Sequence, residues 1–261
     1  MVTDFSAVPV VVLCGGNGIF IDETGIRQNK ALVRVNGEPM VIHVMRIYLR
    51  AGFRAFVLAG GYQGPSLLST IVSGYQGAAV TGTPGAFNIT VSGIACNVRF
   101  VNTPENARTG DRLMACRPFV DSHDWFCATY SDTLSDVDLI NMHRFHQSHG
   151  KVATLVAAEY PTRFRILGVR LGESQVRGFS PRPVLGTEPI NGGFYFFGRG
   201  IFERDFLAYQ TENVVLEEEV FDRLVAAREL MAFFQQGSWQ HLDSERDLKS
   251  LARIAQSLKI C

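Results

Sequence analysis

The sequence has no surplus of charge of either sign. Its 261 residues carry 25 Lys and Arg against 25 Asp and Glu. Proteins that bind nucleic acid or an anionic membrane surface usually have a basic excess, so we expect neither partner here. Any phosphate group that this chain binds must therefore be held by individually placed side chains and backbone N–H groups.

The chain also lacks a long apolar run near its start. Residues 8–14 form the longest one there; they include Pro9 and are too few to span a membrane, and no secretory signal pattern precedes them. The five cysteines are an odd number and none belongs to a CxxC pair, which is typical of small apolar residues in a reducing compartment. We expect a cytoplasmic protein.

Three of the six histidines, His143, His146 and His149, are spaced by three residues. On a helix this spacing places side chains on a slowly turning stripe, so the three could converge on a metal ion only loosely. We interpret the segment as a half-exposed helix that ends at Gly150, and we assign no metal to it.

The sequence does contain short apolar runs that end in glycine or polar residues. Hydrophobic residues make up 46% of the chain, enough for a large core. Residues 8–13 predict a buried parallel strand that enters a turn containing Gly15, Gly16 and Gly18. Such a turn either presents N–H groups to a phosphate or only reverses the chain, and both interpretations stay open.

The rest of the pattern alternates helices and strands. We expect helices over residues 40–51, 65–73, 113–117, 139–149, 216–228 and 245–258, strands over 56–58, 125–130, 152–158, 190–197 and 230–234, and an antiparallel excursion within 78–103. About twenty loop residues separate Gly18 from the first helix, which excludes a dinucleotide-binding fingerprint and a P-loop. We find no linker or repeat and predict one mixed-sheet α/β domain over residues 1–261.

Two aspartates are candidates for a site. Asp132 directly follows the strand 125–130, and ligands of open α/β sheets bind outside the carboxyl ends of the strands. We expect Asp136 and Asp138 to cap the next helix, which leaves Asp132 available for a ligand. Asp243 precedes the last helix and is an equally good candidate for its cap, in competition with Ser244.

Two glycines lie in the predicted strand 190–197, directly before its aromatic residues 194–197. Gly192 and Gly193 permit a close approach of the backbone to a ligand, or they form a β-bulge.

Short motifs follow one another in a fixed order along nearly the whole chain. The first set is Gly15-Gly16-x-Gly18, Lys30, Gly37-Glu38-Pro39-Met40, Gly61-Tyr62-x-Gly64 and Thr109-Gly110-x-Arg112-Leu113. The second set is Tyr130-x-Asp132, Ile190-Asn191-Gly192-Gly193-Phe194 and Trp239-Gln240-His241-Leu242-Asp243. The first set resembles the sugar-nucleotide pyrophosphorylases, a family of nucleotidyltransferases, and the second resembles its glucose-1-phosphate cytidylyltransferase branch. Each motif is weak alone, but their order and spacing are specific.

The resemblance implies a Rossmann-like, GT-A-like nucleotidyltransferase fold with a mixed, mostly parallel sheet. It also implies a Mg²⁺-dependent reaction in which a sugar 1-phosphate attacks a nucleoside triphosphate, CTP for this branch, and pyrophosphate leaves. The implied nucleotide-binding residues are Gly15, Gly16, Gly18, Lys30, Gly110 and Arg112. The implied catalytic residues are Lys30, Asp132 and Arg182, the sugar side is Tyr130, Asn191, Gly192 and Gly193, and the metal ligands are Asp132 and Asp243. Members of the family commonly form homo-oligomers.

The chain departs from the family pattern in its first loop. The family carries Gly-x-Gly-Thr-Arg-Leu there, whereas this chain continues Gly18-Ile19-Phe20-Ile21, without the arginine that steadies the triphosphate. Arg182 stands where the family has a lysine. The candidates to compensate are Arg27, Arg108 and Arg112. Two alternatives to an ordinary transferase stay open: a catalytically degenerate binding protein, and a divergent transferase with an unusual, more apolar acceptor.

Overall fold

The structure is a computed structural model that describes residues 4–16, 19–74, 79–80, 85–159, 166–167, 179–180, 189–203 and 213–258. Gly18 and Arg182 lie outside the described residues, so their roles stay predictions. Among the described residues, no helix combines the length and the apolar character needed to cross a membrane.

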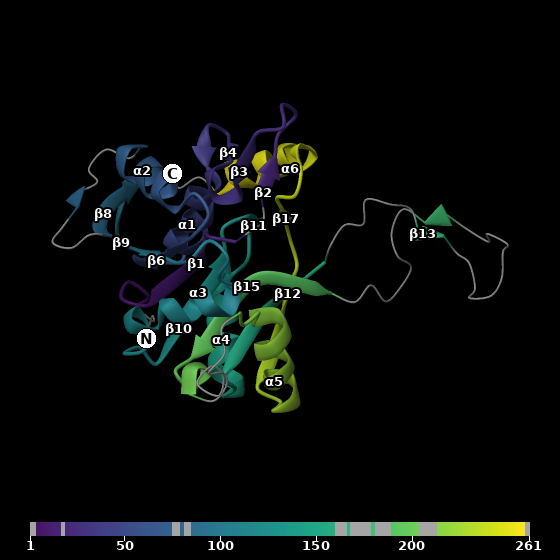
Figure 1. The fold of residues 1–261 in the computed structure, drawn as a ribbon. Coiled ribbons are helices and arrows are strands. Elements are labelled where there is room, and N and C mark those ends of the chain that lie inside the picture. Colours follow the sequence, from purple (N-terminus) through teal and green to yellow (C-terminus); the bar gives the residue numbers. More distant parts are fainter. Residues whose placement is uncertain are drawn as a thin grey trace.

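Nine strands of the described chain form one sheet in the order β16-β12-β15-β10-β1-β6-β9-β8-β7 (Figure 1). They are β1 (Pro9–Leu13), β6 (Ala55–Gly60), β7 (Ala79–Val80), β8 (Ala86–Val91), β9 (Ile94–Asn102), β10 (Trp125–Tyr130), β12 (Ala153–Ala158), β15 (Ile190–Gly198) and β16 (Leu230–Gln235). Only β8 and β15 are antiparallel to both of their neighbours, so seven strands run in one direction. The predicted α/β fold with a mixed, mostly parallel sheet is confirmed.

The helices are α1 (Met40–Arg50), α2 (Gly64–Gly74), α3 (Thr109–Ala115), α4 (Leu139–His149), α5 (Phe221–Ala226) and α6 (Glu245–Ser257), with 3-10 turns at Lys30–Leu32 and Arg117–Phe119 and a π-helical turn at Leu216–Val220. Four short strand pairs are β2 (Ile19–Ile21) with β3 (Arg27–Asn29), β4 (Arg34–Val35) with β5 (Glu38–Pro39), β11 (Thr133–Ser135) with β17 (Trp239–His241), and β13 (Ile166–Leu167) with β14 (Phe179–Ser180).

Two hydrophobic cores lie on opposite faces of the sheet. Successive side chains of a strand point to opposite faces, so Val10 and Val12 enter one core and Val11 and Leu13 the other. The first core includes side chains of α1, α2, α4 and α6, and the second includes side chains of α3 and α5. Because β1 is covered on both faces, its residues are all buried, which explains the continuous apolar run.

Several predicted boundaries were wrong. The stretch before α1 is a hairpin, β2–β3, rather than a plain loop; the Asp22 carboxylate accepts hydrogen bonds from the N–H groups of Thr24 and Ile26 and closes its turn. Within 78–103 the pairings of β7 with β8 and of β8 with β9 are antiparallel, as predicted, but β9 also pairs parallel with β6 and so joins the segment to the main sheet. The predicted helix 216–228 is divided into the π-helical turn and α5.

Two predictions about the starts of helices also differ from the structure. α3 begins at Thr109, four residues before the predicted start, because the Asp111 carboxylate accepts from the N–H of Arg108 at 3.0 Å. Asp138 caps α4 as predicted, but Asp136 accepts instead from the Gln235 side chain and the N–H of Ser238.

The histidine segment forms α4, which ends at Gly150 with φ of +64°, as predicted. His146 Nδ1 and His149 Nε2 each lie 2.8 Å from the hydroxyl of Thr154. His143 packs against the Trp125 ring, with 4.5 Å between the ring centroids. Burial lowers the pKa of His146 to about 4, so its imidazole is neutral at pH 7. These side chains are part of the packing between α4 and the sheet.

Candidate active site

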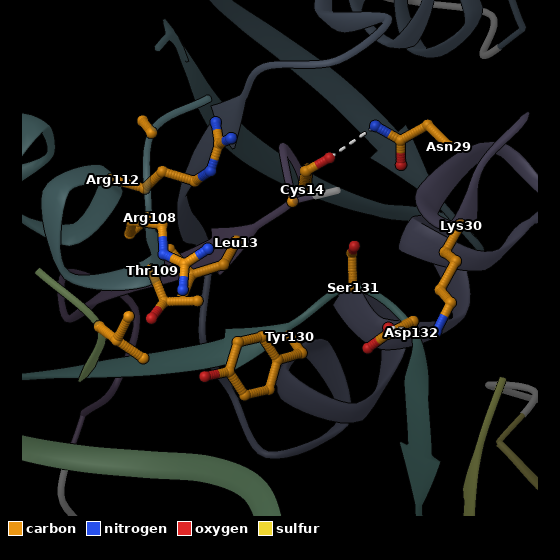
Figure 2. Close-up of a pocket in the computed structure, with 13 residues that line it drawn as sticks. Leu13, Cys14, Asn29, Lys30, Arg108, Thr109, Arg112, Tyr130, Ser131 and Asp132 are labelled. Atoms are coloured by element: carbon orange, nitrogen blue, oxygen red, sulfur yellow. Dashed lines mark hydrogen bonds and ion pairs between the residues drawn. The ribbon is translucent and has the colours of Figure 1, made fainter. Parts of the chain in front are cut away.

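The described residues form a pocket of about 310 Å³ at the carboxyl ends of β1 and β10 (Figure 2). β10 lies on one side of β1, and β6, the next strand along the chain to join this sheet, lies on the other. Ligands of open α/β sheets bind at such a switch point. The pocket is lined by Leu13, Cys14, Gly16, Asn29, Lys30, Ala107, Arg108, Thr109, Arg112, Tyr130, Ser131, Asp132 and Val215.

Lys30 is the centre of a charged cluster at one side of this pocket. Its Nζ lies 2.9 Å from Oδ1 of Asp243, 3.4 Å from Oδ2 of Asp132 and 3.2 Å from Nε2 of His241. The side chain of Asn29 donates to the carbonyls of Cys14 and Tyr62, at 2.7 Å each, and accepts from the N–H of Ala31. Asn29 therefore fastens the turn that carries Lys30 to the loops after β1 and β6.

The carboxylate of Asp132 is incompletely satisfied. Its Oδ1 is buried and has no hydrogen-bond partner among the described residues; His241 Nδ1 lies 3.6 Å away, beyond hydrogen-bonding distance. Buried polar atoms in native proteins are nearly always paired, and an unpaired carboxylate oxygen beside a pocket is suited to a cationic or hydrogen-bonding ligand. Asp132, which the sequence marked by its position after a strand, therefore lies in the wall of the pocket.

The strand pair β11–β17 brings Asp243 to Asp132. Thr133 pairs with His241, and the N–H of Leu242 donates to the carbonyl of Asp132 at 2.8 Å. The cap of α6 is Ser244, whose hydroxyl donates to Asp247. The side chain of Asp243 points to Lys30 instead and is 68% exposed. The capping interpretation of Asp243 was therefore wrong.

These side chains meet the requirements of a magnesium site in part. Among the described residues, no three His, Cys, Asp or Glu side chains form a complete metal cage. However, the carboxylates of Asp132 and Asp243 both contact one point, the Lys30 ammonium. Mg²⁺ is usually bound by one or two carboxylates together with waters and substrate phosphates, so this donor set fits that ion.

Arg112 also lines the pocket, but its guanidinium forms hydrogen bonds within the protein. The side chain is 1% exposed, and it donates to the carbonyls of Gly60 at 2.9 Å and Glu105 at 3.0 Å and to the hydroxyl of Thr103. Burial lowers its pKa from the ordinary arginine value. Arg112 therefore fastens the loops after β6 and β9 to the start of α3.

Gly15 and Gly61 make room for this guanidinium. A Cβ atom at either position would lie 2.2 Å from Arg112 Nη1, and one at Gly15 would also lie 2.6 Å from the backbone of Gly60. Gly16, the next residue, lines the pocket. Gly110 lies away from it: a Cβ there would meet Val214 at 2.7 Å, and its N–H donates to the Val214 carbonyl. Packing accounts for Gly15, Gly61 and Gly110 without a ligand.

Replacing Arg112 with Met should lower the free energy of unfolding by about 2–4 kcal/mol, because the buried guanidinium would no longer donate charged hydrogen bonds to the carbonyls of Gly60 and Glu105 and to the hydroxyl of Thr103. Urea denaturation measures this change. The matched control is Arg144→Met on α4, since Arg144 is exposed and bonds only locally to Asn141; about 0.5 kcal/mol or less is expected there. Equal stability of both variants would contradict this account of Arg112.

The predicted sugar side is divided between the pocket and the strand next to it. Tyr130 lines the pocket, and its buried hydroxyl has no partner among the described residues. Gly193 has φ of +78°, and a Cβ there would lie 3.0 Å from the Tyr130 ring. Asn191 is exposed; its side chain accepts from the N–H of Gly193 and donates to the hydroxyl of Tyr195. The carbonyl of Gly192 accepts from the Trp239 indole.

The pairing of β12 with β15 shifts register between Leu155 and Ala157, opposite this segment. The bulge interpretation of the two glycines is thus confirmed. Asn191, Gly192 and Gly193 are not in the wall of the described pocket, and of the three Gly193 packs against Tyr130.

The residues of the pocket wall that were missed as site residues include three with an amide or hydroxyl group: Asn29, Thr109 and Ser131. Ser131 adjoins Asp132 and could have been found from the strand end. Asn29 carries no local signal, because its partners lie 15 and 33 residues away along the chain. Cys14 also lines the pocket, but burial raises the pKa of its thiol, so it is not a nucleophile.

The model of the nucleotidyl transferase family matches residues 9–254. The chain belongs to this family. It is 32% identical over 245 residues to the glucose-1-phosphate cytidylyltransferase of Salmonella typhimurium, with 91% of each chain covered.

Other relatives differ in the nucleotide that they are named for. The mannose-1-phosphate guanylyltransferase catalytic subunit beta of Xenopus tropicalis is 23% identical, with 95% of this chain and 65% of that protein covered. Among solved structures, the inositol-1-phosphate CTP transferase from T. maritima superposes with a TM-score of 0.67 at 15% identity and covers 99% of this chain and 100% of that one. That similarity shows the shared Rossmann-like fold.

Proposed function

We propose that this protein joins a nucleoside triphosphate, CTP, to a sugar 1-phosphate and releases pyrophosphate. The observation that carries the proposal is the Lys30 ammonium held between the carboxylates of Asp132 and Asp243, beside a pocket at the switch point of the sheet. The full-length similarity to a named glucose-1-phosphate cytidylyltransferase supports the same reaction class.

In the proposed step, an oxygen of the sugar phosphate attacks the α-phosphorus of the nucleotide. A new P–O bond forms as the bond to the pyrophosphate oxygen breaks, and pyrophosphate takes that electron pair. Such reactions depend mainly on positioning and on neutralising the negative charge of the phosphates. Lys30 provides a fixed positive charge, and a backbone N–H at Gly16, which lines the pocket, is suited to a phosphate oxygen.

Asp132 and Asp243 would hold Mg²⁺ in this proposal. When bound, the ion supplies charge neutralisation at the phosphate oxygens. The chain's own contribution is the arrangement of two carboxylates around Lys30, so that a positive charge is present at this place before a ligand enters.

CTP is the expected nucleotide because the cytidylyltransferase match covers most of both chains. The guanylyltransferases are similar over most of this chain too. A panel of all four nucleoside triphosphates is therefore the appropriate experiment, each with Mg²⁺ and with glucose, mannose and inositol 1-phosphates.

We expect pyrophosphate release with CTP and a sugar 1-phosphate, and weaker release with the other nucleotides. Absence of pyrophosphate with every pair would contradict the proposal. Nucleotide binding measured by calorimetry without any turnover would instead support the alternative of a catalytically degenerate binding protein, which the missing first-loop arginine favours.

A further inference from the structure

Three basic side chains line the described pocket: Lys30, Arg108 and Arg112. Two of them are already engaged, since Lys30 contacts two carboxylates and Arg112 donates to the carbonyls of Gly60 and Glu105. The Arg108 side chain differs from both, because it is exposed and its guanidinium makes no hydrogen bond or ion pair with another described residue. Arg108 is therefore the basic residue of the described pocket wall whose guanidinium N–H groups are available to a ligand.

The backbone of Arg108 is nevertheless held firmly. Its N–H donates to Asp111 at 3.0 Å, and the same carboxylate accepts from the N–H groups of Asn213 and Val214 at 3.1 Å. The next residue, Thr109, donates its hydroxyl to Glu217 and accepts from the N–H of Leu216. A guanidinium on a fixed backbone loses less conformational freedom when it binds a ligand.

Figure 2 shows Arg108 beside Leu13 and Thr109 on one side of the view, with Lys30 and Asp132 on the other. The pocket thus has a mixed, carboxylate-rich side and a basic side. The glycine turn and β2, residues 15–21, contain no Lys or Arg that could supply a cation between them. With Mg²⁺ on the two carboxylates, as proposed above, a long, highly charged anion would be complementary to both sides of the pocket.

We propose that Arg108 binds the triphosphate of the nucleotide, with its planar fork on two phosphate oxygens. The proposal rests on the function proposed above and assigns the nucleotide side of its pocket. The triphosphate is preferred to the single phosphate of the acceptor because Arg108 and the pair Lys30 and Asp132 lie on opposite sides of the pocket (Figure 2), so that one anion that reaches both sides must be extended.

The test compares Arg108→Met, Arg108→Lys and the control Arg144→Met with the wild type. Calorimetric titrations use CTP, GTP, inorganic pyrophosphate and glucose 1-phosphate as separate probes, with Mg²⁺ present. Because a charged hydrogen-bond donor is lost, Arg108→Met should bind CTP and pyrophosphate roughly 10- to 100-fold more weakly than the wild type. Its affinity for glucose 1-phosphate should be unchanged. Arg108→Lys should recover part of the loss, because lysine keeps the charge without the fork. Arg144→Met should bind like the wild type.

Unchanged affinity for CTP and pyrophosphate in Arg108→Met would overturn the proposal, as would a loss confined to glucose 1-phosphate. Because binding is measured apart from turnover, the two proposals fail separately. A wild type that binds CTP through Arg108 but releases no pyrophosphate would contradict the transferase function and support the role of Arg108. Turnover with an unaffected KM for CTP in Arg108→Met would support the transferase function and contradict the role of Arg108.

Discussion

Replacing Asp132 with Asn should lower kcat/KM for nucleotidyl transfer about a thousandfold. The substitution keeps the size of the side chain but removes the negative charge that faces Lys30 and replaces one carboxylate oxygen with an NH2 group, which cannot bind a cation. In the proposed reaction, that charge is needed both to bind the Mg²⁺ ion and to orient the Lys30 ammonium. The measurement is the initial rate of pyrophosphate release with CTP, glucose 1-phosphate and Mg²⁺.

This variant should still fold, because Lys30 keeps its 2.9 Å contact with Asp243. The matched control is Asp222→Asn, an exposed aspartate on α5 away from the pocket, for which the wild-type rate is expected. A folded Asp132→Asn enzyme with more than a tenth of the wild-type rate would be incompatible with a catalytic role for this carboxylate.

Replacing Lys30 with Met should lower kcat/KM on the order of a hundred- to a thousandfold. The side chain is 11% exposed, and its ammonium is positioned by the 3-10 turn that begins at Lys30 and by the hydrogen bonds of Asn29. Met fills a similar volume, so the lost rate reports the lost charge. The two carboxylates would then repel each other without the ammonium between them, which should reduce stability at low ionic strength.

Lys30→Arg should recover little of this activity, because a guanidinium is a wide planar fork and the point charge of lysine fits between Asp132 and Asp243. Lys249→Met, on the exposed face of α6, removes the same charge outside the pocket and should leave the rate unchanged. Rates near the wild type for Lys30→Met would remove Lys30 from the mechanism.

Some of the site could be predicted from local pattern. Asp132 was found because a polar residue after a buried strand lies at the carboxyl edge of the sheet, and the position of the pocket confirms that placement. Asp243 was ambiguous, since any polar residue before α6 is a candidate cap; only the geometry shows that Ser244 caps the helix. Lys30 has no local signal at all and was marked by resemblance alone.

The remaining contacts are long-range and could not be predicted from single segments. Arg112 was expected to bind nucleotide, yet its guanidinium is hydrogen-bonded to a carbonyl 52 residues away. The parallel pairing of β9 with β6 was missed because alternation of side chains predicts a strand but not its neighbour. The register shift opposite Gly192 and Gly193 likewise depends on β12, which lies more than thirty residues before them along the chain.

The most direct test of the central proposal is a ³¹P NMR time course with CTP, glucose 1-phosphate and Mg²⁺. The account predicts that pyrophosphate and a CDP-sugar appear in equal amounts as the signals of CTP and glucose 1-phosphate decline together, and that Asp132→Asn shows neither product on the same timescale. Release of phosphate or CMP without a CDP-sugar, or equal product formation by wild type and Asp132→Asn, would contradict nucleotidyl transfer at this site.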